Sequence, residues 1–367
     1  MNCIDLFAGA GGLSLAAHRS GLRVRLAIER DKSAVATYRA NLCRGDDPPV
    51  VLEGDIAAMR PSEIFDLAFG PGEICDLLLG GPPCQGFSTH RLNDSGVGDE
   101  RNGLVNVYFA FVRQFRPTAF LMENVPGMLW PRHARHLDAM QHQARDAGYH
   151  LFEPVVIDAR DFGVPQRRKR VIILGLEKSV VRDDFTWPPE PTHVRPTGDG
   201  VPPGRLPWLN CEAVFAAAPT GDPNDVHMKH RADLVAAFAR TPTDGGSRGA
   251  SGRVLECHRG HDGHSDVYGR IDRRQPAPTM TTACINPSKG RFVHPTLNHG
   301  ITARQAARIQ TFPDDYVFHG GLMAAGQQIG NAVPVKLGVA LIAHVVALLE
   351  ATGRRRAGTR RNECVVA

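Results

Sequence analysis

The sequence predicts an α/β fold built on a doubly wound sheet, with a smaller domain inserted into it. Short apolar runs alternate with amphipathic stretches, first at residues 3–7, 13–18, 24–28 and 33–42. This alternation of strand and helix is typical of a parallel sheet. Prolines break the pattern after residue 185, and Gly, His and Arg become frequent up to about residue 294. Because helical patterns return at residues 303–309 and 333–349, we expect the irregular segment to be an insertion.

The other elements of the main domain follow the same rhythm. Strands are expected at residues 77–79, 119–122, 155–157 and 171–174, and helices at 104–115 and 134–147. The last helix has Pro334 at its start and Gly353 just past its end, which are favourable positions for both residues. His344 interrupts its apolar run, so we expect no membrane-spanning segment. We therefore assign residues 1–185 and 298–353 to the main domain, 186–297 to the second domain and 354–367 to a basic, disordered tail.

The composition of the 367 residues is that of a globular protein. A hydrophobic content of 42% excludes a disordered chain, and a net charge of +5 fits a polyanionic partner as well as many enzymes of small molecules. Eight cysteines stand at irregular spacings, with no secretory leader before Asp5. This usage predicts reduced thiols and a cytoplasmic location.

Three predicted loops at the carboxyl edge of the sheet have the residues of an adenosine site. Residues 5–14 form a glycine-rich turn between a strand and a helix, where backbone amides can approach a ligand closely. Such a turn alone is equally compatible with no ligand. Glu29 ends the second strand and is placed to accept hydrogen bonds from ribose hydroxyls, and Asp55 is placed to contact an adenine amino group. Together the loops predict an adenosine-containing cofactor.

Two further strands end in residues suited to covalent chemistry. Cys84 lies among prolines and glycines in residues 80–88, directly after an apolar strand. A thiol in such a rigid loop is poorly placed to fill a core, so we interpret it as a nucleophile. Glu123 ends the next strand at the same edge, although a cap or an ion pair would explain it equally well. Residues 166–170 form a basic cluster in which alternation puts Arg168 and Arg170 on one face, unless the cluster is simply a solvated charge run.

These segments together resemble the DNA cytosine-5 methyltransferases. The shared motifs lie, in the family's order and spacing, at residues 5–14, 80–88, 123–125, 166–170, 304–313 and 328–335. Only the segment from about residue 186 to 297 stands outside the pattern. The resemblance implies an S-adenosylmethionine-dependent, Rossmann-like methyltransferase domain with an inserted target-recognition domain.

The resemblance also implies a role for individual residues. Cys84 would attack carbon 6 of cytosine with Glu123 as its partner, Arg168 would hold the cytosine, and Arg170 would support the loop that carries Cys84. Arg30 departs from the family, because many members have an apolar or aromatic residue there. The implied S-adenosylmethionine pocket consists of Phe7, Gly9, Gly11, Glu29, Asp55, Ile56, Pro83, Leu104, Asn331 and Val333.

The chemistry requires access to both faces of the base, so the target nucleotide must leave the duplex. The second domain is therefore expected to clamp double-stranded DNA and to recognise a specific sequence. Residues 269–282 are the candidate contact segment, although a surface hairpin without a DNA role fits the same pattern. The predicted DNA contacts are Gln85, Ser88, Arg270, Arg273, Arg274, Thr279 and Thr281. No metal is expected at Cys257, His258, His261 and His264, because adjacent Cys and His side chains diverge.

The sequence thus predicts a DNA (cytosine-5) methyltransferase that acts as a cytoplasmic monomer on DNA of the nucleoid. An RNA (tRNA) cytosine-5 methyltransferase of the same fold is the first alternative, but the Cys-Phe-Thr tripeptide of those relatives is missing from the sequence. A catalytically silent DNA-binding module would not need Cys84, Glu123 and a cofactor pocket together, and a NAD-dependent oxidoreductase is the remaining alternative. Whether a restriction endonuclease or another phage-defence protein accompanies the enzyme is left open.

Overall fold

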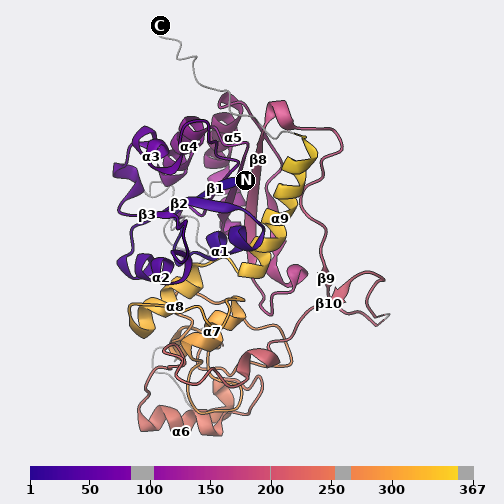
Figure 1. Ribbon diagram of the computed structural model, residues 1–367. Coiled ribbons are helices and arrows are strands. Elements are labelled where there is room, and N and C mark those ends of the chain that lie inside the picture. Colours follow the sequence, from indigo (N-terminus) through magenta and orange to yellow (C-terminus); the bar gives the residue numbers. More distant parts are fainter. Residues whose placement is uncertain (84–102, 199, 253–265, 354–367) are drawn as a thin grey trace.

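The main domain is a twisted sheet covered by helices on both faces (Figure 1). The computed structural model describes residues 1–83, 103–198, 200–252 and 266–353. Within them, an eight-stranded sheet has the order β3-β2-β1-β4-β5-β8-β6, and β7 also pairs with β8. Its strands are β1 (Asn2–Leu6), β2 (Arg23–Glu29), β3 (Val50–Glu53), β4 (Leu77–Gly80), β5 (Ala119–Asn124), β6 (Tyr149–Leu151), β7 (Val155–Asp158) and β8 (Lys169–Glu177).

Side chains that alternate along each strand pack into two separate cores. On one face, Ile4 and Leu6 of β1 join the apolar side chains of α3 (Pro61–Ala68), α4 (Gly103–Phe115) and α5 (Ala134–Asp146). On the other face, Cys3 joins α1 (Gly12–Arg19) and α9 (Val335–Ala351). Burial of both faces is the arrangement of a doubly wound sheet, so the predicted fold class is confirmed.

One strand runs against the predicted direction. β8 pairs antiparallel with β5, whereas β1 to β5 are parallel. The chain enters β8 from β7 through a short connection that holds only the 3-10 helix η6 (Ala159–Phe162). A parallel neighbour would need a longer crossover. The sheet is therefore mixed at this side, and the expectation of a parallel sheet is corrected for β8.

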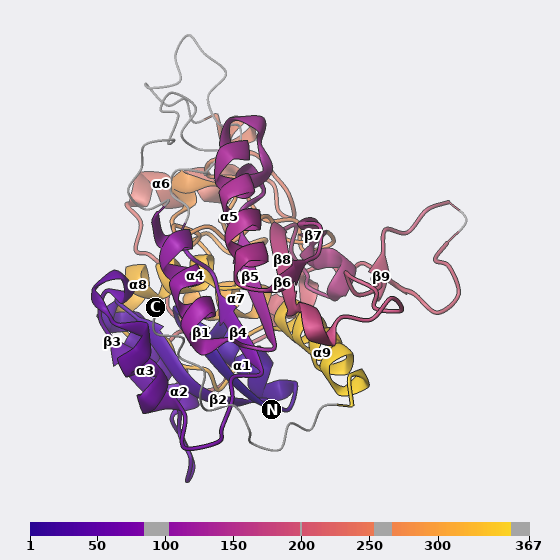
Figure 2. The same ribbon diagram turned by 90° about the horizontal axis from the view of Figure 1, so that it is seen from above.

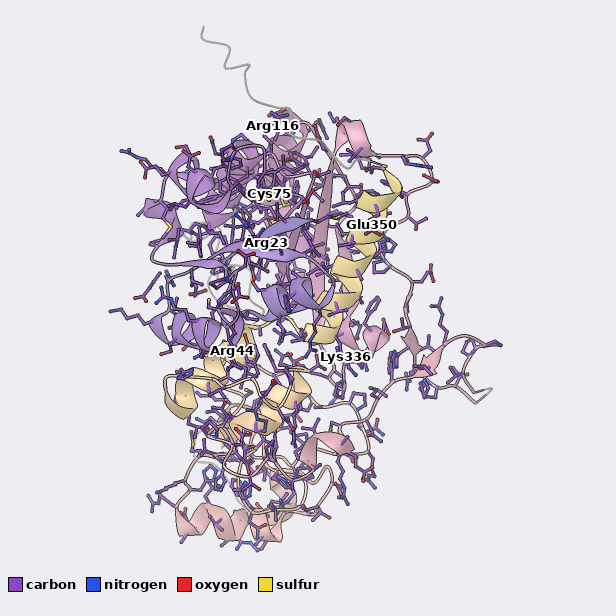
Figure 3. The ribbon with its side chains drawn as sticks, in the orientation of Figure 1. Arg23, Arg44, Cys75, Arg116, Lys336 and Glu350 are labelled. Atoms are coloured by element: carbon purple, nitrogen blue, oxygen red, sulfur yellow. The ribbon has the colours of Figure 1, made fainter. Side chains whose placement is uncertain are left out.

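The last helix of the main domain returns to the first. α9 packs along α1, where a Cβ on Gly338 would lie 2.7 Å from the Cβ of Ala16. Figure 3 labels Lys336 and Glu350 near its two ends. By length and composition Gly321–Ala351 is apolar enough to cross a membrane, but 56% of its most apolar window is buried inside the protein. This burial is typical of a core helix.

The inserted segment is mostly irregular and lies at the far end from the sheet, around α6 (Ala232–Arg240) in Figure 1. The ribbon of β9 (His193–Val194) and β10 (Leu206–Pro207) extends sideways from the body in Figure 2. Between α6 and the sheet lie α7 (Ala303–Ile309) and α8 (Gly321–Asn331), and α2 (Lys32–Leu42) flanks the sheet. A third core unites Ile285 with Ile301 and Ala306, so packing is continuous where the sequence places the limit at 297/298. The domain limits themselves remain a prediction.

Candidate active site

The candidate site lies where the strand order reverses, between β1 and β4. Leu6 pairs with Gly80, so the glycine-rich turn after β1 and the loop after β4 leave the sheet side by side. In open α/β sheets, ligands bind in the crevice outside the carboxyl ends of the strands at this switch point. Cys84, Gln85 and Ser88 lie outside the described residues, as do Cys257, His258, His261, His264 and the tail from residue 354.

The glycine-rich turn is held in a shape that leaves space above it. Phe7, Gly9 and Gly11 have φ values of 60°, 55° and 88°. A Cβ on Gly11 would lie 2.5 Å from one side chain and 3.0 Å from two others, whereas a Cβ on Gly9 would meet nothing within 4 Å. The turn is therefore packed tightly against the protein at Gly11 and open at Gly9, which suits a ligand that approaches the backbone closely. The side chains below Gly11 are Tyr38, Leu42 and Tyr316.

Glu29 ties this turn to the end of β2. Its Oε2 accepts a hydrogen bond from the Gly9 amide at 2.9 Å, and its Oε1 accepts from the amides of Arg30 and Asp31, both at 2.8 Å. A carboxylate has about four acceptor positions, so Glu29 retains capacity for a ribose hydroxyl. The carboxylate was expected here from the sequence, whereas its second role in fixing the turn was not.

The other predicted cofactor residues surround the same edge. β3 lies beside β2, and Asp55 follows it as an exposed cap of η1 (Ile56–Ala58), with Ile56 buried. α4 begins near Leu104 and contacts η1. A Cβ on Gly12 would lie 2.8 Å from the carbonyl oxygen of Val333, which brings the end of α8 to the turn. Pro83 and Leu104 are half-buried, while Arg30 and Asn331 are exposed.

A buried carboxyl group that sequence analysis did not single out supports the turn from below. Asp5 is 1% exposed and accepts a 2.7 Å hydrogen bond from Ser14 Oγ, which in turn accepts one from the Tyr38 hydroxyl. Its Oδ1 has no partner among the described residues. Burial raises the pKa of Asp5 to about 7, although the Ser14 hydrogen bond opposes the shift. This carboxyl is therefore poised to titrate near neutral pH.

Glu123 and Arg170 form the polar centre of the site. Arg170 Nε lies 2.7 Å from Glu123 Oε1, and each side chain is 14% exposed. A Cβ on Gly81 would lie 3.2 Å from Glu123 Oε2, so the carboxylate rests against the start of the loop that leads to Cys84. Antiparallel pairing of β5 and β8 brings the two charges to one edge of the sheet.

Contrary to the prediction, the guanidinium of Arg168 is bound elsewhere and not at this polar centre. Its side chain is 1% exposed, and its Nη1 donates to the carbonyl of Met280 at 2.8 Å. Its Nη2 donates to the carbonyls of Gly330 and Ala332, both at 2.9 Å. Because these donors are occupied by the protein, the structure contradicts the prediction that Arg168 holds the cytosine. Arg170 stands beside Glu123 instead.

Arg270 is likewise a structural residue. It is 1% exposed, and its guanidinium donates to the carbonyls of Phe238, Thr241, His294 and Leu297 and to Asn298 Oδ1. Phosphate contacts need an accessible cation, so burial contradicts the prediction that Arg270 contacts DNA.

The predicted DNA contacts that remain among the described residues are at least partly accessible. Arg273 and Arg274 pair with Asp244 and Asp272, and their side chains are 41% and 68% exposed. Thr281 is half-buried, and the half-buried Thr279 donates a hydrogen bond to the carbonyl of Arg167. Among the described residues, no group of three or more His, Cys, Asp or Glu side chains is arranged to hold a metal ion.

Comparison with known proteins decides the family. The model of a family described as C-5 cytosine-specific DNA methylase matches residues 1–347. The chain belongs to this family. The methylase is accordingly a DNA cytosine-5 methyltransferase, and the use of S-adenosylmethionine is general in its family.

Two curated relatives align with the methylase over most of their length. The type II methyltransferase M.Eco47II of Escherichia coli is 31% identical over 96% of this chain and 80% of the relative. M.AgeI of Thalassovita gelatinovora, also a type II methyltransferase, is 30% identical over 93% of this chain and 98% of the relative. The two alignments therefore span more than nine tenths of the methylase.

Solved structures share the fold of the methylase. A prophage-encoded protein of E. coli, described as a DNA modification methyltransferase, has a TM-score of 0.72 at 23% identity and covers 95% of this chain and 99% of its own. The Dnmt2 methyltransferase of S. pombe has a TM-score of 0.56 at 15% identity, over 95% of this chain and 99% of its own.

Proposed function

We propose that the methylase flips a cytosine out of duplex DNA, attacks its carbon 6 with Cys84 and methylates carbon 5 within a specific sequence. The observation that carries this proposal is the Glu123–Arg170 ion pair, which lies against Gly81 at the switch point of the sheet. The carboxylate of this pair lies close to Gly81, three residues before Cys84 in the sequence, which supports the proposal. The glycine-rich turn opens at the same edge.

The turn and its neighbours fit S-adenosylmethionine. Gly9 leaves open space above a backbone of positive φ, and Glu29 retains acceptor capacity beside it. We assign the ribose to Glu29, the adenine to Asp55 and Ile56, and the remaining wall to Phe7, Gly11, Pro83, Leu104, Asn331 and Val333. When bound, the cofactor supplies the electrophilic methyl group that carbon 5 receives.

The residues of the chain itself provide the covalent step. Carbon 5 of cytosine is a weak nucleophile, so the Cys84 thiolate first forms a bond to carbon 6 and breaks the aromaticity of the ring. Glu123 shares a proton with the ring nitrogen and thereby offsets the negative charge that develops there. Arg170 fixes the orientation of this carboxylate. After methylation, a base such as water takes the proton from carbon 5 and the carbon–sulfur bond breaks, which returns the thiolate.

The second domain, which we place at residues 186–297, is proposed to recognise the DNA. Flipping a nucleotide costs a few kcal/mol, and contacts to backbone and base edges must offset this cost. Arg273 and Arg274 are accessible cations for phosphates, and Thr279 and Thr281 lie near the end of the same segment. We assign further contacts to Gln85 and Ser88.

The relatives support a proposal for the biological setting. M.Eco47II and M.AgeI are type II methyltransferases, and we infer that this methylase likewise modifies DNA. We propose that it acts as a cytoplasmic monomer alongside a restriction endonuclease or another phage-defence system.

Bisulfite sequencing tests the proposed function. The methylase and its Cys84→Ser variant are expressed in a host without cytosine-5 methylation, and both genomic DNA and transfer RNA are sequenced. We expect 5-methylcytosine at one short DNA sequence with the wild type and none with the variant. Methylation of transfer RNA without methylation of DNA would contradict the proposal.

A further inference from the structure

Arg168 joins three parts of the chain that are far apart in sequence. It stands directly before β8, and its Nη1 donates to the carbonyl of Met280 at 2.8 Å. Its Nη2 donates to the carbonyls of Gly330 and Ala332 at 2.9 Å each. One rigid guanidinium therefore connects the sheet, the segment that contains Thr279 and Thr281, and the end of α8.

The last two of these parts also touch directly. A Cβ on Gly330 would overlap the carbonyl of Thr281, so backbone packs on backbone with no side chain between them. α8 lies between the sheet and the inserted segment (Figure 1). A shift of the turn after α8 must therefore displace residues 281 and 282 as well.

Two buried amide side chains repeat the same connection. The Met280 amide donates to Gln166 Oε1 at 2.8 Å, and Gln166 Nε2 donates to Gln310 Oε1 at 2.7 Å. Gln310 Nε2 then donates to the carbonyls of Ile329 at 2.6 Å and Ala332 at 2.9 Å. The junction is thus a continuous polar network, and its groups are enclosed by protein.

The charge of Arg168 is balanced in an unusual way. The hydrogen bonds of its guanidinium all go to carbonyl oxygens, and its Nε has no partner among the described residues. Two of these carbonyls lie at the C-terminal end of α8, where the helix dipole favours a cation. Removal of the guanidinium would take this donor from all three carbonyls and leave the Gln166–Gln310 pair as the remaining polar connection.

We propose that Arg168 is a positioning residue that couples the cofactor pocket to DNA binding. Asn331 stands between Gly330 and Ala332, the two residues whose carbonyls Arg168 holds, and Thr281 follows Met280. A cofactor that contacts Asn331 holds the turn after α8 in one position. The hydrogen bonds of the Arg168 guanidinium then hold the segment of Thr279 and Thr281 in a matching position for DNA. The inference rests on the proposed function, because it takes Asn331 as a cofactor residue and Thr279 and Thr281 as DNA contacts.

Hydrogen exchange tests the coupling in the unmodified protein. S-adenosylhomocysteine is the probe, and the amides of residues 280–284 are compared with those of α6. We expect the probe to slow exchange at residues 280–284 by about fivefold or more and to leave α6 unchanged. Exchange at residues 280–284 that does not respond to the bound probe would overturn the inference.

Variants test the part of Arg168 itself. DNA affinity is measured by fluorescence anisotropy with and without saturating S-adenosylhomocysteine, on the duplex in which bisulfite sequencing finds 5-methylcytosine. We expect the probe to tighten wild-type DNA binding by about fivefold or more, and to change it less than twofold in Arg168→Met. Arg168→Lys keeps the charge but replaces the planar guanidinium with a single ammonium group. We therefore expect the probe to tighten DNA binding in this variant by an intermediate factor.

Arg167→Met is the matched control. Arg167 is the exposed neighbour of Arg168, so the variant loses one cation but leaves the junction intact. S-adenosylhomocysteine should therefore tighten its DNA binding by the same factor as in the wild type. A folded Arg168→Met protein whose DNA binding is tightened by the probe as much as that of the wild type would overturn the inference. If Arg168→Met does not fold, Arg168→Lys and the exchange measurement decide. A wild type that neither binds the probe nor methylates DNA would instead refute the proposed function.

Discussion

Arg170 and Glu123 form an ion pair across two antiparallel strands, with Nε 2.7 Å from Oε1 and each side chain 14% exposed. The pair lies against Gly81, at the start of the loop that carries the proposed nucleophile. Its position determines which arginine of the basic cluster belongs to the site.

Glu123→Gln should abolish most methyl transfer. The amide keeps the shape of the side chain but cannot share a proton with the ring nitrogen, and such proton transfer contributes about 10²–10⁴-fold. Incorporation of radioactive methyl groups into DNA measures the rate. Arg170→Lys keeps the charge and should lose less activity than Arg170→Met. A Glu123→Gln protein within threefold of the wild-type rate would contradict the assignment of Glu123.

Glu29→Ala should weaken S-adenosylmethionine binding and also destabilise the fold. It removes a proposed ribose contact of about 1–3 kcal/mol together with the acceptor for the Gly9, Arg30 and Asp31 amides. Asp55→Ala should weaken binding similarly with a smaller effect on stability, because its side chain caps a short helix. Titration calorimetry and thermal unfolding measure the two effects.

Glu53→Ala is the control for both variants. Glu53 pairs in register with Glu29 but belongs to no proposed contact, so its removal should leave cofactor affinity unchanged. Equal cofactor affinity in all three variants and the wild type would exclude this pocket.

Asp5→Asn should change how stability depends on pH. Burial holds the pKa of Asp5 at about 7 in the folded protein, against 3.8 for the free side chain. Between these values the unfolded chain ionises while the folded carboxyl stays protonated. The contribution of Asp5 to stability is therefore full below about pH 4 and is lost as pH rises to about 7, by at most about 4 kcal/mol.

Urea unfolding at pH 5 and pH 8 tests this prediction. The asparagine side chain of the variant cannot ionise, so the variant should gain stability relative to the wild type as the pH rises. A difference between wild type and variant that is the same at both pH values would show that Asp5 does not titrate in this range.

The positions that the sequence predicted well are those fixed by local pattern. Glu29 and Glu123 were expected at the carboxyl ends of strands and are found there, because an apolar run followed by a polar residue marks a strand end in any orientation. The direction of β8 has no such local mark, since a buried strand shows the same apolar run whether it is parallel or antiparallel. α8 was missed because its glycines weaken the helical pattern.

The errors at Arg168 and Arg270 have a different cause. Alternation was expected to put Arg168 and Arg170 on one face, but Arg168 is buried against carbonyls more than 100 residues away, whereas Arg170 lies beside Glu123. Arg270 was interpreted as a DNA contact because an arginine in a basic run usually faces solvent. Its acceptors come from both sides of it in the chain, and only the folded segment brings them together.

Arg270→Met should destabilise the inserted segment without a specific effect on DNA contacts. The change leaves several buried acceptors unpaired, at a total cost of about 3–5 kcal/mol. Thermal unfolding measures the loss. Arg274→Met is the control, because Arg274 is 68% exposed and pairs with Asp272 at the surface, where an ion pair contributes about 0–1 kcal/mol. Equal stability of the two variants would contradict the structural role of Arg270.

Covalent trapping tests the central claim most directly, namely that Cys84 attacks the flipped cytosine. With 5-fluorocytosine at the target, addition at carbon 6 and methylation at carbon 5 proceed, but elimination fails because fluorine does not leave as a cation. The wild-type protein should therefore remain attached to the duplex on a denaturing gel in the presence of S-adenosylmethionine. Cys84→Ser should lose nearly all of this product, because a hydroxyl is hardly ionised at neutral pH. Equal yields in both proteins, or no complex with a wild type that methylates the ordinary duplex, would exclude Cys84 as the nucleophile.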